Sequence, residues 1–125
     1  MSTEAAALLR ESATLIRSVG LHRAGGLWPG HSSLARTFVK YTPGDPVCAI
    51  GALAVVAERQ DAPMAARTEA MAALDGEIGR RRYVHPLSDG ARVGVASWSD
   101  LIATGPEDIA ATFELVATQI QEGQT

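Results

Sequence analysis

Several residue types are scarce in this sequence, and their scarcity limits what the protein can be. Lys40 is the only lysine against ten arginines, and no asparagine occurs among the 125 residues. The single cysteine, Cys48, cannot form an intramolecular disulfide. No apolar run reaches the ~20 residues of a membrane-spanning helix, and charged Glu4, Arg10 and Glu11 stand where a signal peptide would be apolar. We therefore expect a cytoplasmic protein with no membrane association.

Sequence motifs for nucleotides and metals are missing as well. The chain has no glycine-rich loop ending in Gly-Lys-Ser/Thr, no dinucleotide fingerprint, no Cys-x-x-Cys and no Gly-x-Ser-x-Gly. Cys48 with His22, His31 and His85 supplies the ligand types of a zinc site, but their spacings match no compact ligand pair. We expect neither a metal ion nor a cofactor.

The charge distribution argues against a broad nucleic-acid-binding face. The net charge is −3, and residues 63–125 carry five Lys and Arg against nine Asp and Glu. The run Arg80-Arg81-Arg82 is the exception, because three guanidinium groups could contact phosphate or an acidic partner. It follows a predicted helix, where cations complement the helix dipole. Nucleic acid is therefore not an expected partner.

Hydrophobic periodicity predicts a mainly α fold in a single domain, residues 1–125. Apolar side chains recur at helical spacing within 3–19, 61–79 and 104–120. A fourth segment, 47–59, is apolar on every side until Glu58, which predicts a buried central helix. The expected architecture is four helices around that central one.

Local signals predict where these helices begin. Asp45-Pro46 is typical of a helix start, because Asp caps the first amides and proline fits the first helical position. Asp61 is expected to cap the next helix. Thr104 and Glu107 have the spacing of a capping box at the start of the last one.

Two segments do not follow a helical pattern. Residues 21–45 are glycine-rich and irregular, with a short strand possible at 37–41, and a loop of this length indicates either function or a misassigned element. Residues 83–97 contain two short candidate strands, 83–85 and 92–97, around Pro86 and a Ser-Asp-Gly turn. They predict a small β-hairpin.

Cys48 carries the sharpest catalytic hypothesis. Near the start of the predicted central helix, free amides and the dipole would stabilise its thiolate. His31 or His85 would serve as the base and Asp100 would orient it. Against this, the surrounding Val-Cys-Ala-Ile-Gly-Ala-Leu is apolar and free cysteine is usually buried. Core packing is the favoured interpretation, with catalysis as the alternative.

Two tryptophans stand in polar or glycine-rich contexts. Trp28 lies in Gly-Gly-Leu-Trp-Pro-Gly and Trp98 in Ser-Trp-Ser-Asp, next to Asp100. Either indole could form a recognition surface together with Asp100, since tryptophan is enriched in binding hot spots. The alternative, which we favour, is that each ring closes the core at a helix end while its N–H finds a partner. Asp100 would then accept amides in a turn.

These motifs together resemble a family of small uncharacterised proteins from actinobacteria and their phages. The likeness lies in the order Gly26-Leu27-Trp28, then Cys48-x-x-Gly51-Ala52-Leu53, then Trp98-Ser99-Asp100, then a final helix opening at 104–109. In that family the tryptophan triplet is more often Trp-Asn-Asp, so Ser99 departs from it. The resemblance implies a shared fold and no particular activity.

The sequence thus favours a non-enzymatic interaction or regulatory protein that binds a host protein, with a phage or prophage origin as one option. The expected binding surface is the Trp28 loop and the surroundings of Trp98. The alternative function is a small thiol-dependent enzyme that uses Cys48. A homodimer is compatible with the sequence.

Overall fold

The computed structural model of the chain describes residues 2–23, 25–32, 36 and 39–123. Within these ranges the chain is mainly α-helical and forms no strand, which confirms the predicted class. None of the described helices is long and apolar enough to cross a membrane. The elements in chain order are α1 (Ser2–Val19), α2 (Ala49–Gln60), α3 (Met64–Arg80), α4 (Val95–Ser97), the π-helical turn η1 (Trp98–Ile102) and α5 (Pro106–Glu122).

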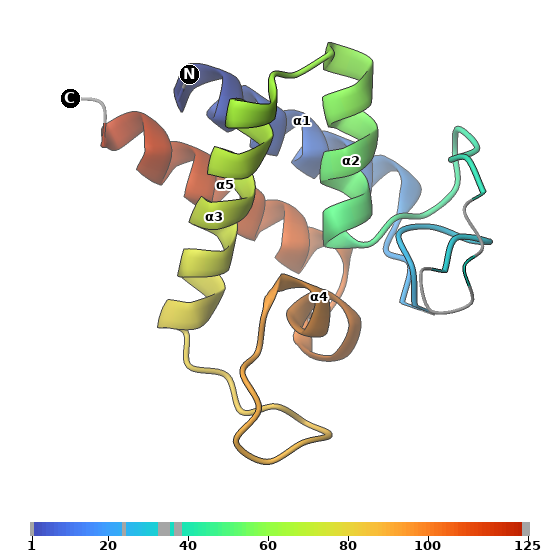
Figure 1. Cartoon of the computed structure of the whole chain (residues 1–125), viewed down its shortest axis with the longest axis vertical. Coiled ribbons are helices and arrows are strands. Elements are labelled where there is room, and N and C mark those ends of the chain that lie inside the picture. Colours follow the sequence, from blue (N-terminus) through green and yellow to red (C-terminus); the bar gives the residue numbers. More distant parts are fainter. Residues whose placement is uncertain (1, 24, 33–35, 37–38, 124–125) are drawn as a thin grey trace.

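The long helices are arranged in two layers (Figure 1). α1 and α5 run side by side in opposite directions and make the most extensive contact between any two described helices. α2 packs on α1 and α4, whereas α3 packs on α1, α5 and α4. α2 and α3 lie in front of the α1–α5 pair and diverge without packing closely on each other.

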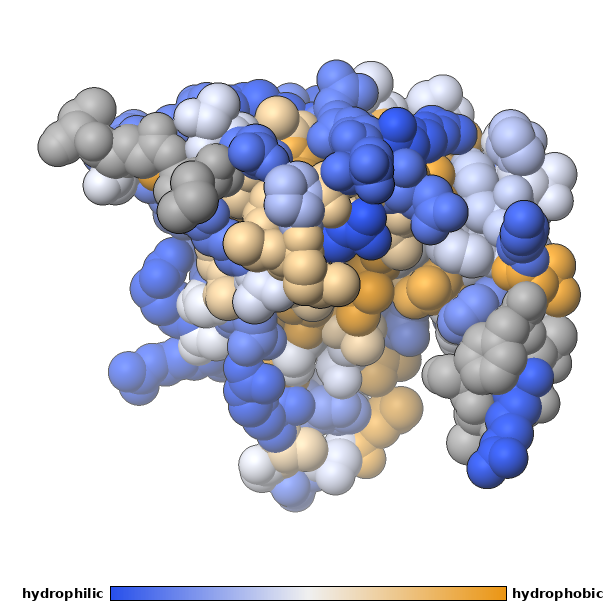
Figure 2. Space-filling view, turned by 45° about the horizontal axis from the view of Figure 1, so that its top comes forward, coloured by the Kyte–Doolittle hydropathy of each residue, from blue (hydrophilic) through white to orange (hydrophobic). Residues whose placement is uncertain are grey.

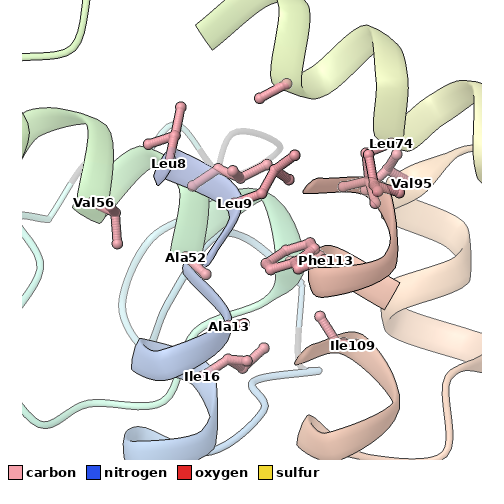
Figure 3. Packing of buried hydrophobic residues seen from close by; sticks show 14 of the residues in the cluster. Leu8, Leu9, Ala13, Ile16, Ala52, Val56, Leu74, Val95, Ile109 and Phe113 are labelled. Atoms are coloured by element: carbon pink, nitrogen blue, oxygen red, sulfur yellow. The ribbon is translucent and has the colours of Figure 1, made fainter. Parts of the chain in front are cut away.

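The core lies between these layers, and its apolar side chains come from every described α-helix (Figure 3). Leu9 and Ile16 of α1 face Ile109 and Phe113 of α5, and all four are fully buried. Their spacing of seven residues in α1 and four in α5 places them on one stripe of each helix, as the sequence predicts. Burial of each such side chain stabilises the fold by about 1.5–3 kcal/mol.

An arginine joins the outer edges of the same two helices. Arg17 of α1 donates hydrogen bonds to both carboxylates of Glu107 and Glu114 on α5, at 2.7–2.8 Å. These bonds lower the pKa of each carboxyl and raise that of the guanidinium. Because Glu107 pairs with Arg17, the amide of Thr104 is capped instead by Asp108, at 3.0 Å, and the predicted capping box does not form.

The buried helix α2 begins later than its sequence indicates. Its cap is Cys48, and Asp45-Pro46 precedes the helix in non-helical backbone. The reason is a non-local pairing, because Val47 forms an isolated parallel β-bridge with Leu21. Val47 N–H donates to Gly20 O at 3.1 Å, and Val47 O accepts from His22 N–H at 2.9 Å. This extended backbone delays the first helical turn.

Asp61 also has a different role from the predicted one. It adopts the left-handed conformation, with φ of 49°, and ends α2 by donating its N–H toward Ala57 and Glu58. Two residues of connection follow, and α3 starts at Met64 with Pro63 before it. The prediction that Asp61 caps the third helix was wrong, because the preceding helix uses that residue as its own terminus.

The predicted β-hairpin at 83–97 is wrong. A turn with a 3.2 Å bond from Ala91 N–H to Ser88 O lies within it, but the segment then enters α4 and η1. The physical reason is the spacing of the residues that reach the core: Val95 and Trp98 are three apart, which suits a helix. The described residues therefore form five α-helices rather than the four that the sequence predicts.

The irregular segment 21–45 is confirmed as non-helical where the structure describes it. Thr37 and Phe38 of the predicted strand 37–41 lie outside the described residues, and Val39, Lys40 and Tyr41 are not in a strand.

Candidate functional site

Three segments that are far apart in sequence meet at the N-terminus of α2. The amide of Cys48 donates to the carbonyl of Leu27 at 3.0 Å, and the amide of Ala49 donates to the hydroxyl of Ser99 at 3.0 Å. The thiol sulfur of Cys48 accepts the amide of Gly51 at 3.3 Å. The Gly-Leu-Trp, Cys-x-x-Gly-Ala-Leu and Trp-Ser-Asp elements therefore form one structural unit that caps a helix.

Gly51 permits the close approach within this unit. A Cβ atom at this position would lie 2.3 Å from the carbonyl oxygen of Leu27. Any side chain would push the Leu27 segment away from α2 and stretch its bond to Cys48. The glycine is needed for space, since Leu27 is packed directly on the first turn of the helix.

Cys48 is a buried capping residue. Only 6% of it is exposed. Burial raises the pKa of the thiol above its ordinary value, and the negative charge of Asp100 acts in the same direction, against the lowering effect of the amides of Gly51 and Ile50. A thiol with a raised pKa is protonated at neutral pH, which argues against a nucleophilic Cys48.

The histidines chosen as bases have other partners. Nδ1 of His31 accepts the amide of Leu27 at 3.2 Å, which shapes the loop beside α2. Nδ1 of His85 accepts the amide of Leu87 at 3.1 Å, in the loop between α3 and α4. Both hydrogen bonds stabilise local turns. Neither imidazole makes a described contact with the thiol of Cys48.

Asp100 has neighbours that the sequence did not indicate. Desolvation raises the pKa of its carboxyl, while the charges of His22 and Arg23 oppose that shift. Arg23 also donates to the carbonyl of Ala103, just after η1. The β-bridge between Leu21 and Val47 holds the segment that follows α1 beside the start of α2, so His22 and Arg23 lie near Asp100. Sequence spacing contains no signal of that pairing.

Trp98 is a core residue. Its ring is fully buried and lies under the guanidinium of Arg81, 6.0 Å from the ring centroid. Its indole Nε1 has no hydrogen-bond partner among the described residues. The burial argues against direct contact of Trp98 with a partner.

Trp28 closes the core from the irregular segment. It is half-buried, and its indole N–H donates to the carbonyl of Val39 at 2.8 Å. Tyr41 packs against it edge-on with 5.5 Å between centroids, and His31 lies 5.4 Å away. This cluster is satisfied internally, which favours the packing interpretation of Trp28 over a recognition role.

The arginine run is largely part of the fold. The carboxylate of Glu77 lies between Arg80 at 2.7 Å and Arg81 at 3.0 Å, and the bond from Arg80 is the first cause of its lowered pKa. Arg81 also donates to the hydroxyl of Thr112 at 3.1 Å. Arg82 is exposed. Two of the three guanidinium groups are therefore occupied by contacts within the chain.

An open groove begins between the diverging helices α2 and α3 and continues along α3 to residues 92–96, and we call it the interhelical groove. It consists of two hollows of about 690 and 200 Å³ that share Ile50, Arg67 and Met71. Figure 2 shows apolar surface gathered between polar margins on this side of the molecule. The groove is lined by Leu8, Ile50, Leu53, Ala54, Ala57, Met64, Arg67, Thr68, Met71, Ala72, Asp75, Arg92, Gly94, Val95 and Ala96.

The fold and these sites define a small α-helical protein with a capped, buried cysteine and an open apolar groove. Among the described residues, no group of three or more His, Cys, Asp or Glu side chains could hold a metal ion. The chain belongs to the Family of unknown function DUF6197, whose model matches residues 1–119. Comparison with curated proteins and with solved structures finds no match.

Proposed function

We propose that this protein is a non-enzymatic interaction protein, of phage or prophage origin, that binds a host protein in the interhelical groove. The observation that carries the proposal is the divergence of α2 and α3. Two consecutive helices ordinarily bury their apolar stripes against each other, whereas here residues of α2 and α3 line two adjoining hollows that open to solvent.

The composition of the groove supports protein binding. Met64 is 72% exposed, and Ile50, Ala54 and Met71 are only half-buried. A contiguous apolar surface of this kind typically marks an interaction site in a protein of this size. Methionine side chains also adapt their shape to a partner, because they are unbranched and flexible.

The alternative function, a thiol-dependent enzyme at Cys48, has less support. A thiol-dependent enzyme needs a nucleophile that loses its proton near neutral pH and a base within hydrogen-bond reach. Burial raises the pKa of Cys48, and the Nδ1 atoms of His31 and His85 accept backbone amides of their own loops. The helix-capping role accounts for Cys48, so protein binding is the better-supported function.

Site-specific photo-crosslinking in the host cell tests the proposal. A benzophenone amino acid replaces Ala72, which is exposed and lines the groove, or Ala111, which is exposed on α5 outside it. We expect a discrete crosslinked protein from position 72 and none from position 111. Loss of that band when Met64→Glu is added would support the groove, since the apolar contact is removed. Equal crosslinking from both positions, or none from position 72, would refute it.

A further inference from the structure

We infer that the groove takes one amphipathic helix of the partner, about three turns long, with acidic side chains at both ends. This inference rests on the proposed function and specifies the partner segment. The spacing of the lining residues, the length of the α3 wall and the charges at the two ends of the groove support it.

Both helices line the groove at helical spacing, α2 in the smaller hollow and, at Ile50, in the larger one, and α3 along both. On α2 the lining positions are 50, 53, 54 and 57, and on α3 they are 64, 67, 68, 71, 72 and 75. Each set follows steps of three and four, so each wall is a single ridge of one helix. A groove between two such ridges suits a third helix, whose own ridge of side chains packs between them.

The length of the α3 wall sets the length of the occupant. From Met64 to Asp75 the helix advances about 16 Å, at 1.5 Å per residue. Leu8 of α1, which is buried, also lines the smaller hollow. Three helical turns of a partner therefore cover the open wall from end to end.

The charges of the groove select an acidic helix. Arg67 stands at one end, where it donates to the carbonyls of Ala62 and Ala57, and Arg92 stands at the other, paired with Asp75. Asp75 is the only carboxylate lining the groove and its charge is matched by Arg92, which leaves the lining with an excess positive charge.

Both arginines retain donors for a ligand. A guanidinium has five N–H donors, and the described bonds use two in Arg67 and one in Arg92. The side chain of Arg92 is 68% exposed. Carboxylates on the first and last turns of a bound helix would reach these groups. The rest of the chain is net acidic and would repel such a helix, so charge directs it to the groove.

The test uses fluorescent stapled peptides of about 12 residues, held helical, with leucines spaced three and four apart. One version carries glutamates in its first and last turns, and the other carries lysines at the same positions. Fluorescence anisotropy against the full chain should show the glutamate peptide binding at least about tenfold more tightly than the lysine peptide. Amide chemical-shift changes should map to α2 and α3.

Variants of one ion pair give matched changes of opposite sign. Asp75→Asn should tighten the glutamate peptide and Arg92→Gln should weaken it, each severalfold, while Arg82→Gln, at an exposed site outside the groove, should change nothing. Ala72→Trp, which fills the groove without changing its charge, should abolish binding. Thermal unfolding of each variant shows that it is folded.

The remaining outcomes would overturn the inference in distinguishable ways. Equal binding of both peptides would show that acidic side chains are not required. Chemical-shift changes away from α2 and α3 would show that the peptide does not bind in the groove. Failure of both peptides together with a crosslink from position 72 would leave the proposed function standing and refute the helical partner. A dimer in sedimentation that Ala72→Trp dissociates would show that a second copy fills the groove instead.

Discussion

The hydroxyl of Ser99 accepts a hydrogen bond from the amide of Ala49 at 3.0 Å, fifty residues away in the sequence. The amide belongs to the first turn of α2, and Ser99 comes from η1, so the two form a helix cap supplied by another element. Together with the sulfur of Cys48, it satisfies amides that the helix itself leaves free.

We expect Ser99→Ala to lower the free energy of unfolding by about 1–2 kcal/mol, because the buried amide of Ala49 loses its acceptor. Chemical denaturation followed by circular dichroism measures this. The control is Ser97→Ala, which removes a half-buried hydroxyl that caps no helix. A Ser99→Ala loss no larger than that of the control would show that the cap contributes nothing.

Two glycines should respond oppositely to the same substitution. Gly51→Ala should destabilise the fold by roughly 1–3 kcal/mol, because its Cβ would meet the carbonyl of Leu27 at 2.3 Å. Gly76→Ala on α3 has nothing within 4 Å of the new Cβ, so it should stabilise the protein by about 0.5–1 kcal/mol. Thermal unfolding of both variants checks the pair. Equal effects would contradict the close approach of Leu27.

Cys48 should resist alkylation in the folded protein. Burial raises its pKa, so iodoacetamide at pH 8 should react much faster with the denatured chain than with the native one. Mass spectrometry over time gives both rates. A native reaction that is fast, with a midpoint below ~8.5, would revive the thiol enzyme. The same raised pKa means that the contribution of Cys48 to stability is complete below the unfolded value and declines as the pH rises above it.

Glu77 should make the fold sensitive to acid. Its pKa is lowered by Arg80 and Arg81, so its stabilising effect is present at neutral pH and is lost as the pH falls below the ordinary value of 4.5. Glu77→Gln should cost roughly 1–3 kcal/mol at pH 7. The difference from the native chain should shrink in acid.

Denaturation at a series of pH values measures that difference. Glu69→Gln, at a half-exposed position of α3, controls for the loss of one negative charge. A difference that stays constant down to pH 3 would contradict the role of the Glu77 ion pair.

The sequence predicted the helices whose stability is local. α1 and α5 carry apolar stripes that match their buried faces, because amphipathic spacing depends only on neighbouring residues. In α3 the predicted stripe matches only in part, since Leu74 and Ile78 are buried but Met64 is exposed. The start of α2 was misplaced, since Asp45-Pro46 is a valid local signal but the pairing of Leu21 with Val47 overrides it. The hairpin was predicted from alternation over a few residues, which cannot reveal that Trp98 has to reach the core from a helical turn.

The candidate site likewise has features that the local sequence predicts and features that it does not. Burial of Cys48 followed from its apolar neighbours. The contributions of His22 and Arg23 near Asp100, and the divergence of α2 and α3, depend on how separate elements pack, and no spacing within one segment encodes them.

The dominance of the contact between α1 and α5 has a consequence for synthesis of the chain. α1 leaves the ribosome before α5, on which it mainly packs. At ordinary translation rates α5 is synthesised roughly 5–20 seconds after α1, and until then the apolar stripe of α1 lacks its main packing partner. During that interval Leu8, Leu9 and Ile16 can contact other apolar surfaces. Until α5 emerges, the nascent chain therefore needs either protection of these side chains or fast synthesis.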